Sequence, residues 1–464
     1  MQISEKMSSA ERRSTISLAA IYGLRMLGMF LILPIFAIYA QTLEGGHDHT
    51  MVGLALGAYG LTQVLLQLPF GIASDKYGRK KVIYAGMLIF VVGSVVAAMG
   101  TDIITVIIGR AIQGAGAVSA VVMALVADST REEHRTKAMA TIGGTIGVTF
   151  ALSLVAGPLL NQSIGVSGIF WMTAILAIFA IGVVKFLVPD PVNSHFHSDT
   201  ETAPSKIKEV LRNTQLLRLN FGAFSLHAAQ MAMFVVVPFA LKETSGMSEN
   251  QHWLVYLPVL TISFVMMLPA IIYGEKRAKL KPVFIGAVAT MLFAQLLFAA
   301  NIHHFWGVVM ALFFYFLAFN LLEATLPSLI SKMAPAASKG TAIGIHNTAQ
   351  SLGIFIGAVA GGFLSGNYGF SSVFIFCSVL MAIWLISTFG MKTPPSVKTK
   401  MYHVEALGEK QAATLKQTVE NMDGVEEVAV LAQESTLIVK INNQQTVEAQ
   451  AAIEQNILKL IGSK

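Results

Sequence analysis

Apolar stretches long enough to cross a lipid bilayer recur along the first 391 residues. A helix needs about 20 mainly apolar residues to cross about 30 Å of hydrocarbon. Runs of this length, separated by short polar segments, predict an all-α membrane protein with twelve transmembrane helices. The predicted spans are 15–40, 51–74, 82–100, 104–127, 138–160, 168–188, 217–241, 252–273, 282–301, 305–331, 341–365 and 371–391.

The pattern changes after the last span. Lys392-Thr-Pro-Pro395 ends the helix, because proline cannot continue it. Beyond a linker at 392–399, alternating apolar positions indicate strands and apolar positions at helical spacing indicate helices. Their order is β-α-β-β-α, with a short last strand at 458–461. This order predicts a small α+β ferredoxin-like (βαββαβ) soluble domain at 400–464.

Composition agrees with this division. Hydrophobic residues make up 54% of the chain and charged residues 12%, against about 25% charged in soluble proteins. Of the charged residues, 17 fall in the last 73 positions. The single cysteine, Cys377, excludes an internal disulfide and a cysteine-based zinc site.

The distribution of Lys and Arg predicts orientation. Outside the spans and before residue 392, twenty of them lie in the N-terminal segment and in the loops that follow spans two, four, six, eight and ten. The loops that follow the odd-numbered spans contain one, Lys242. Because cytoplasmic loops accumulate cations, we expect both termini to be cytoplasmic. The net charge of +6 is then a topology signal, and a nucleic-acid partner is not expected.

The spans form a weak internal repeat. An N-terminal half at 1–189 and a C-terminal half at 217–391, each of six spans, flank a polar cytoplasmic linker at 190–216. Residues 69–81 align with residues 269–281. Two similar halves around a midplane site are what a rocking transporter needs.

Two motifs carry charge where lipid or helix dipoles disfavour it. In Gly71-Ile-Ala-Ser-Asp75-Lys-Tyr-Gly78-Arg79-Lys80, the acidic residue ends a helix, where the macrodipole disfavours an anion. Arg79 one turn later, or the helix start near Gly340, can compensate it. In the second motif, an arginine inside a span must face a cavity or a partner. Its residues are Arg110, Gln113 and Gly114.

These motifs resemble those of the major facilitator superfamily, in its drug-exporter-like branch. The resemblance implies that the first motif, with Asp128, closes the cytoplasmic side as a latch. Gly157-Pro158 resembles the fifth-helix motif of proton-coupled exporters, but Ser153 stands where glycine is usual. The tail resembles a heavy-metal-associated domain without its Cys-x-x-Cys, since 407–410 reads Leu-Gly-Glu-Lys. We therefore expect a docking or regulatory module rather than a soft-metal carrier.

Polar residues inside the spans are the candidates for proton and substrate binding. Glu323 is the one carboxylate well inside a predicted span. It is either a protonation site or a structural carboxylate that holds helices together. The other candidates are also ordinary interhelical hydrogen-bonding groups. The candidate set is Arg25, His227, Asn320, Glu323, His346, Asn347 and Gln350.

The resemblance, together with the polar residues inside the spans, thus implies a proton-coupled transporter that exports small molecules across a bacterial inner membrane. Uptake by symport and a membrane sensor signalling through the tail are the alternatives. No Ser-His-Asp set or phosphate loop indicates an enzyme. We expect no cofactor besides the proton gradient, no metal at His47-Asp-His49, and a monomer in the bilayer.

Overall fold

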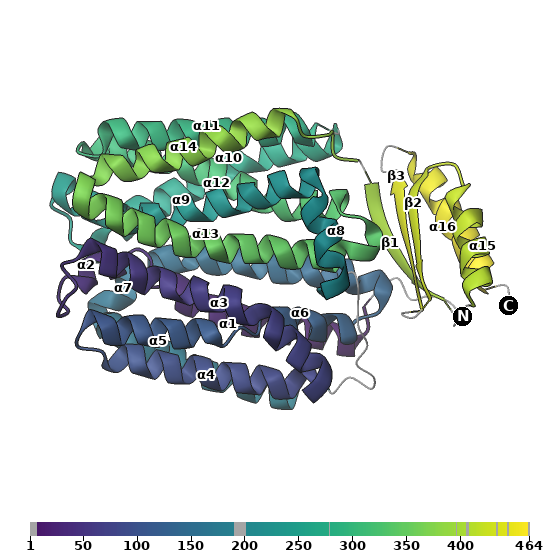
Figure 1. The fold of residues 1–464 in the computed structure, drawn as a ribbon, viewed down its shortest axis with the longest axis horizontal. Helices are drawn as coiled ribbons and strands as arrows, with labels where there is room; N and C mark the ends of the chain where they lie inside the picture. Colours follow the sequence, from purple (N-terminus) through teal and green to yellow (C-terminus); the bar gives the residue numbers. More distant parts are fainter. Residues whose placement is uncertain are drawn as a thin grey trace.

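The computed structural model describes residues 7–189, 201–277, 279–395, 397–404, 408–432, 435–442 and 445–462. A bundle of long helices forms most of the molecule, and a small sheet with two helices covers one end of it (Figure 1). We call the end next to this sheet the tail-proximal end. The opposite end, where α3 begins at His49, is the distal end.

The described part of the N-terminal half contains seven helices, and two of the predicted spans are interrupted. The span at 15–40 breaks at 31–35, and the span at 104–127 breaks at 116–118. Conversely, the spans at 138–160 and 168–188 run together in α7, which turns at Gly165 with φ 68°. The helices are α1 (Ser9–Phe30), α2 (Phe36–Ala40), α3 (His49–Tyr77), α4 (Arg79–Met99), α5 (Ile103–Ala115), α6 (Ser119–Asp128) and α7 (Glu132–Leu187).

The C-terminal half begins inside the predicted linker. The short helices η1 (Pro204–Lys206) and α8 (Ile207–Arg212) precede the first long helix, whereas residues 190–200 of the linker lie outside the described residues. The remaining helices are α9 (Thr214–Ser245), η2 (Glu249–Gln251), α10 (Trp253–Lys276), α11 (Leu280–Asn301), α12 (Phe305–Met333), η3 (Ala336–Ser338), α13 (Lys339–Tyr368) and α14 (Phe370–Phe389).

Ten helical segments of the described chain are long and apolar enough to cross a membrane. One of them, Lys137–Leu187, has 51 residues, more than twice the length of one crossing. It contains the turn at Gly165. These lengths indicate a multi-pass membrane protein, and the number twelve stays a prediction.

The tail forms a three-stranded antiparallel sheet with strand order β1-β3-β2. The predicted last strand at 458–461 is wrong, because these residues lie inside the last helix. Leu458 and Ile461 pack in the tail core on one face of that helix, together with Ile453 and Ile457. The elements are β1 (Val397–His403), α15 (Glu409–Glu420), β2 (Val425–Leu431), β3 (Thr436–Asn442) and α16 (Val447–Gly462).

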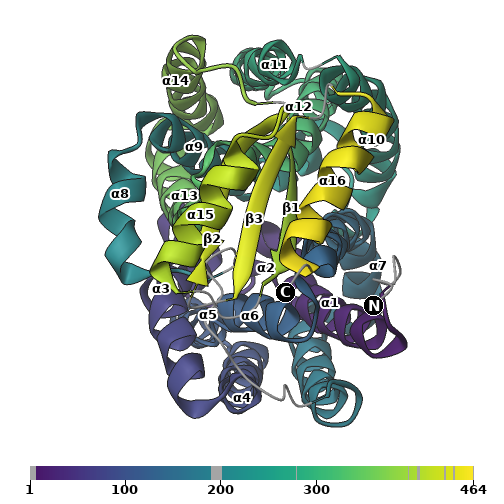
Figure 2. The same ribbon diagram turned by 90° about the vertical axis from the view of Figure 1, so that its right-hand side faces the viewer.

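Both faces of β3 are covered. Leu437, Val439 and Ile441 pack toward α15 and α16 in the tail core. The alternate residues Ile438 and Lys440 are also buried, and Figures 1 and 2 show the sheet between the two tail helices and the bundle. The tail therefore rests on the bundle through its sheet.

The halves meet differently at the two ends. At the distal end, helices touch directly: a Cβ atom added to Gly53 of α3 would lie 2.2 Å from the carbonyl oxygen of Ala358 on α13. Asn161 of α7 donates to Asn250 of η2 at 2.7 Å. At the tail-proximal end, the linker and the tail sheet make the connections described below.

Candidate functional site

The first motif forms a charge cluster at the tail-proximal end. Gly78 has φ 96° and separates α3 from α4, so a residue without Cβ is favoured there. This turn places Arg79 at the start of α4, where it is 3% exposed. Arg79 pairs with Asp75, and its Nε donates to Asp128 Oδ2 at 3.1 Å.

A third carboxylate comes from the linker between the halves. Nη2 of Arg79 donates to both carboxylate oxygens of Glu201 at 2.9 Å. Sequence reasoning missed Glu201, because a single acidic residue in a polar linker has no distinguishing pattern. Three carboxylates on one buried guanidinium tie α3, α4, α6 and the linker together.

Other residues of this motif have simpler roles. Lys80 donates to the carbonyl oxygen of Val188, just beyond α7, at 2.6 Å. The carbonyl oxygen of Gly71 accepts a hydrogen bond from the Ser74 hydroxyl at 2.7 Å. A Cβ atom on Gly71 would meet no neighbour within 4 Å. The side chain of Asp75 is 45% exposed. The start of α13, the second partner suggested for it, instead binds the linker: Ala203 donates to Thr341 Oγ1 at 3.0 Å.

A second ion pair at this end was not predicted either. Glu11 near the start of α1 accepts from Arg131 at 3.0 Å. Burial raises the pKa of Glu11, but hydrogen bonds from Arg131 and Ser8 outweigh it and lower the pKa to about 2. The spacing Ser8-x-x-Glu11 is typical of a capping box at a helix N-terminus, and the structure has one there. This spacing was the one sequence signal that singled out Glu11.

The second motif lies inside the N-terminal half. Arg110 is 1% exposed, and its Nη1 donates to Gln113 Oε1 at 2.8 Å. Gln113 in turn donates to Ser94 at 2.8 Å. A Cβ on Gly114 would lie 2.2 Å from the carbonyl oxygen of Tyr59. Here α5 approaches the α3 backbone closely.

The interior candidates form two groups. In the N-terminal half, Arg25 donates to Ser119. Arg25 and Arg110 both lie against the ring of Tyr59. In the C-terminal half, His227 Nε2 is 3.6 Å from Glu323 Oε2. His346 is 2% exposed and near enough to His227 to interact electrostatically.

The other candidates are less connected. Asn320 Nδ2 donates to Ser263 Oγ at 3.4 Å. Asn347 and Gln350 lie on α13 with half-buried side chains. The structure therefore brings together the His227–Glu323 pair, and it gives these three amides no hydrogen bond to one another within the described chain.

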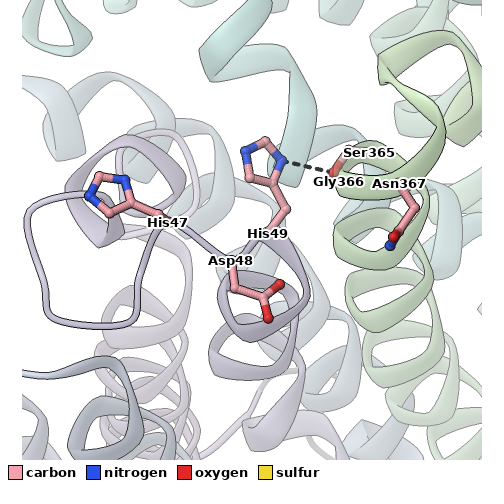
Figure 3. A pocket seen from close by; sticks show the side chains of 6 residues that line it. All are labelled: His47, Asp48, His49, Ser365, Gly366 and Asn367. Carbon is pink, nitrogen blue, oxygen red and sulfur yellow. Dashed lines mark hydrogen bonds between the residues drawn. The ribbon is translucent and has the colours of Figure 1, made fainter.

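A pocket of about 420 Å³ lies at the distal end, lined in part by His47, Asp48 and His49. The three side chains diverge, and His49 faces Ser365 of α13 at 3.1 Å (Figure 3). Its ring stacks on Phe239 of α9 with centroids 5.1 Å apart. His49 thus joins the two halves.

The tail sheet contacts both halves at the tail-proximal end. β1 contacts α7, and β2 contacts η3. Lys440 of β3 donates to the carbonyl oxygen of Ala334, just after α12, at 2.8 Å. Its Nζ also lies 2.6 Å from Glu427. A cation at a helix C-terminus complements the macrodipole, so this lysine anchors the tail to α12.

The chain is similar to known membrane transport proteins over most of its length. Residues 18–358 and 276–407 match the Major Facilitator Superfamily model. The inner membrane transport protein YajR of Escherichia coli is 40% identical over 97% of this chain and 99% of its own length. Multidrug resistance protein 2 of Bacillus subtilis is 25% identical over 79% of this chain and 92% of its own.

Two solved transporters share the fold. The human organic anion transporter MFSD10 aligns with TM-score 0.62 and 18% identity, covering 82% of this chain and all of MFSD10. The nucleoside transporter NupG aligns with TM-score 0.63 and 15% identity over the same shares. These relatives are transporters, not enzymes. The chain belongs to the major facilitator superfamily of membrane transporters.

Proposed function

We propose that this protein is a proton-coupled exporter of small molecules in a bacterial inner membrane. The observation that carries the proposal is the His227–Glu323 pair, 3.6 Å apart, in the interior of the C-terminal half. Carboxylate and imidazole side chains both bind and release protons, and imidazole is a common proton shuttle. Such a pair in a transmembrane segment is a natural proton carrier.

The surroundings of Glu323 favour this role over a purely structural one. Its side chain is 34% exposed and that of His227 is 10% exposed. Apart from its 3.6 Å ion-pair contact with His227, Glu323 Oε2 accepts no hydrogen bond within the described chain. A carboxylate that served only to hold helices together would have its oxygens satisfied.

Alternating access would follow from rocking of the two halves. We count twelve spans by adding α1 to the ten long segments and dividing the 51-residue one at Gly165. The positive-inside pattern places both termini and the tail in the cytoplasm, so the distal end would face the periplasm. The direct helix contacts at the distal end then correspond to a state closed toward the periplasm.

Export is the better-supported direction. One relative is named a multidrug resistance protein of Bacillus subtilis, and another is the multidrug resistance protein MdtH of Aeromonas hydrophila. Uptake and sensing are not favoured, because the names of these two relatives point to drug resistance instead. The energy source would be the proton gradient, with no cofactor, and the unit would be a monomer.

We propose that the tail is a ferredoxin-like domain that has lost its fourth strand and docks on its own bundle. The position of the missing Cys-x-x-Cys lies partly outside the described residues. Deletion of 400–464 separates the functions: a transporter keeps flux, whereas a sensor keeps ligand binding and loses its output.

Substrate-driven proton movement tests the proposal. Pyranine-loaded proteoliposomes with an imposed pH gradient would be screened with a panel of amphipathic anions and cations, including salicylate and ethidium. Glu323→Gln should abolish the coupled pH change. Glu243→Gln, which removes an exposed carboxylate at the distal end of the same half, should preserve it. Coupling that survives unchanged in Glu323→Gln would refute the role of this residue.

A further inference from the structure

Two arginines are buried inside the N-terminal half without a carboxylate partner among the described residues. Arg25 of α1 is 2% exposed and Arg110 of α5 is 1% exposed. Neither takes part in any of the ion pairs found between described side chains. The carboxylate residues in the described part of this half lie at helix ends or in loops, namely Glu11, Glu44, Asp48, Asp75, Asp102, Asp128, Glu132 and Glu133.

Neutral side chains accept hydrogen bonds from only some of the N–H donors of Arg25 and Arg110. Arg25 donates through Nη1 to Ser119, and Arg110 donates through Nη1 to Gln113. Nε and Nη2 of Arg25 and Nε of Arg110 are buried without a hydrogen-bond acceptor in the described chain. A guanidinium has five N–H donors in a planar fork, so both side chains retain unused donors.

Tyr59 of α3 brings the two guanidinium groups to one place. The Cζ atoms of Arg25 and Arg110 lie 5.7 and 5.1 Å from the centroid of its ring. The ring offers each cation a favourable π-face, but it supplies no negative charge. The Tyr59 hydroxyl is itself buried without a partner in the described residues.

Arg79 of the same half shows how this protein satisfies a buried arginine. Its guanidinium contacts three carboxylates, Asp75, Asp128 and Glu201. In the centre of the half, by contrast, two like charges share one aromatic ring. Burying charge without a counterion is costly, and an anion with several acceptor oxygens would relieve both the charge and the unused donors.

We propose that Arg25 and Arg110, with Tyr59 between them, bind the oxyanion group of a small organic anion, a carboxylate or a phosphate. The planar guanidinium matches the paired oxygens of such groups. The inference deepens the proposed function, since this anion would be the transported compound. Ser119 and Gln113 position the two arginines.

Ligand binding to the purified full-length protein tests this assignment without any proton gradient. Thermal unfolding in detergent would be measured in the presence of salicylate, phenyl phosphate or the cation tetraphenylphosphonium. Salicylate or phenyl phosphate should raise the Tm of the wild type, and tetraphenylphosphonium should not. In Arg25→Gln and Arg110→Gln the apparent affinity should fall about 10- to 100-fold, as expected for losing one charge-assisted hydrogen bond.

Lys185→Gln is the matched control, because it removes one cation from the exposed end of α7 in the same half. Its anion affinity should equal that of the wild type. Without ligand, the two arginine variants should be no less stable than the wild type, since each loses a buried unpaired charge. If Arg25→Gln cannot be purified, Arg25→Lys replaces it and should bind with intermediate affinity, because it keeps charge but not the fork.

The proposal is overturned if neither anion stabilises the wild type, or if both arginine variants bind the anion as the wild type does. A variant that loses stability without ligand yet still binds would assign the arginines a structural role instead. Because binding is measured without a gradient, failure of Glu323→Gln to alter proton flux would leave this result unaffected.

Discussion

The two ends of the bundle hold the halves together in different ways. At the distal end α3 and α13 pack backbone to backbone at Gly53 and Ala358, and His49 stacks on Phe239 across the halves. At the tail-proximal end long charged side chains make the connections. Glu201 of the linker binds Arg79, and Lys440 of the tail binds the end of α12.

This difference has a physical consequence. Close packing of small residues is sensitive to separation, because a gap of about 0.5–1 Å already removes a quarter to a half of the dispersion energy. Charged side chains with long stems can exchange partners as helices move. If the halves rock as we propose, the distal contacts would be either made or broken, whereas the tail-proximal charged side chains could exchange partners during the movement.

The largest expected effect comes from the tail-proximal charge cluster. Arg79→Gln leaves the carboxylate of Asp128, whose side chain is 0% exposed, without its guanidinium. Breaking a buried ion pair costs about 3–5 kcal/mol. Thermal unfolding in nanodiscs should show a large loss of Tm. Lys76→Gln, an exposed neighbour, is the control, and an equal loss in that variant would contradict the cluster's importance.

Two glycines that each lie close to a backbone oxygen of a neighbouring helix should respond differently to alanine. A Cβ on Gly53 or on Gly114 would lie 2.2 Å from a backbone oxygen. Gly114→Ala clashes inside one half and should cost about 1–3 kcal/mol of stability, as overpacking does. Gly53→Ala clashes between halves, so separation of the distal ends can relieve it.

Gly53→Ala should therefore lower Tm less than Gly114→Ala and lengthen the distal distance between halves. Thermal unfolding and a spin-label distance across the distal end measure the two quantities. If both variants lose the same amount of Tm and the distal distance in Gly53→Ala equals that of the wild type, the halves do not separate at this interface.

The tail anchor should have a smaller effect. Lys440→Ala removes the donor to Ala334, an interaction of a cation with a helix end worth up to about 2 kcal/mol when partly buried. Limited proteolysis of the segment 392–395, which precedes β1, should become faster. Lys400→Ala removes an ion pair within the tail, 3.1 Å from Glu454, and should leave the cleavage rate unchanged. Equal rates in both variants would argue against the anchor.

The smallest expected effect is a pH dependence at the start of α1. The pKa of Glu11 is about 2 in the fold, below its ordinary value. Its contribution is therefore present near neutral pH and is lost as pH falls from about 4.5 toward 2. Since Arg131 is 42% exposed, we expect less than about 1 kcal/mol. Glu11→Gln should remove this part of the acid sensitivity of Tm, and an unchanged acid profile would contradict it.

Sequence periodicity was sufficient for the long helices and the order of elements in the tail. It could not locate the breaks at 31–35 and 116–118, because the apolar run continues through both. The short last strand was wrong because Leu458 and Ile461 fit a helix face as well as a strand. A burial pattern alone does not distinguish the two over four residues.

The site was predictable where a motif concentrates unlike charges in a few residues, as around Asp75 and Arg79. It was not predictable where partners come from distant segments. Glu201 and Lys440 have ordinary sequence surroundings, and only the fold brings them to Arg79 and α12. His227 and Glu323 were both candidates, but their contact depends on how α9 packs against α12.

Paired distances at both ends test alternating access most directly. With Cys377 replaced by alanine, one sample carries spin labels at Thr101 and His303 of the distal loops, and another at Tyr77 and Lys279 near the tail; all four are exposed. In nanodiscs, across pH 5.5 to 8 and with Gly53→Ala, alternating access predicts reciprocal changes: the tail-proximal pair shortens as the distal pair lengthens. Distances that change together, or at neither end, would contradict it.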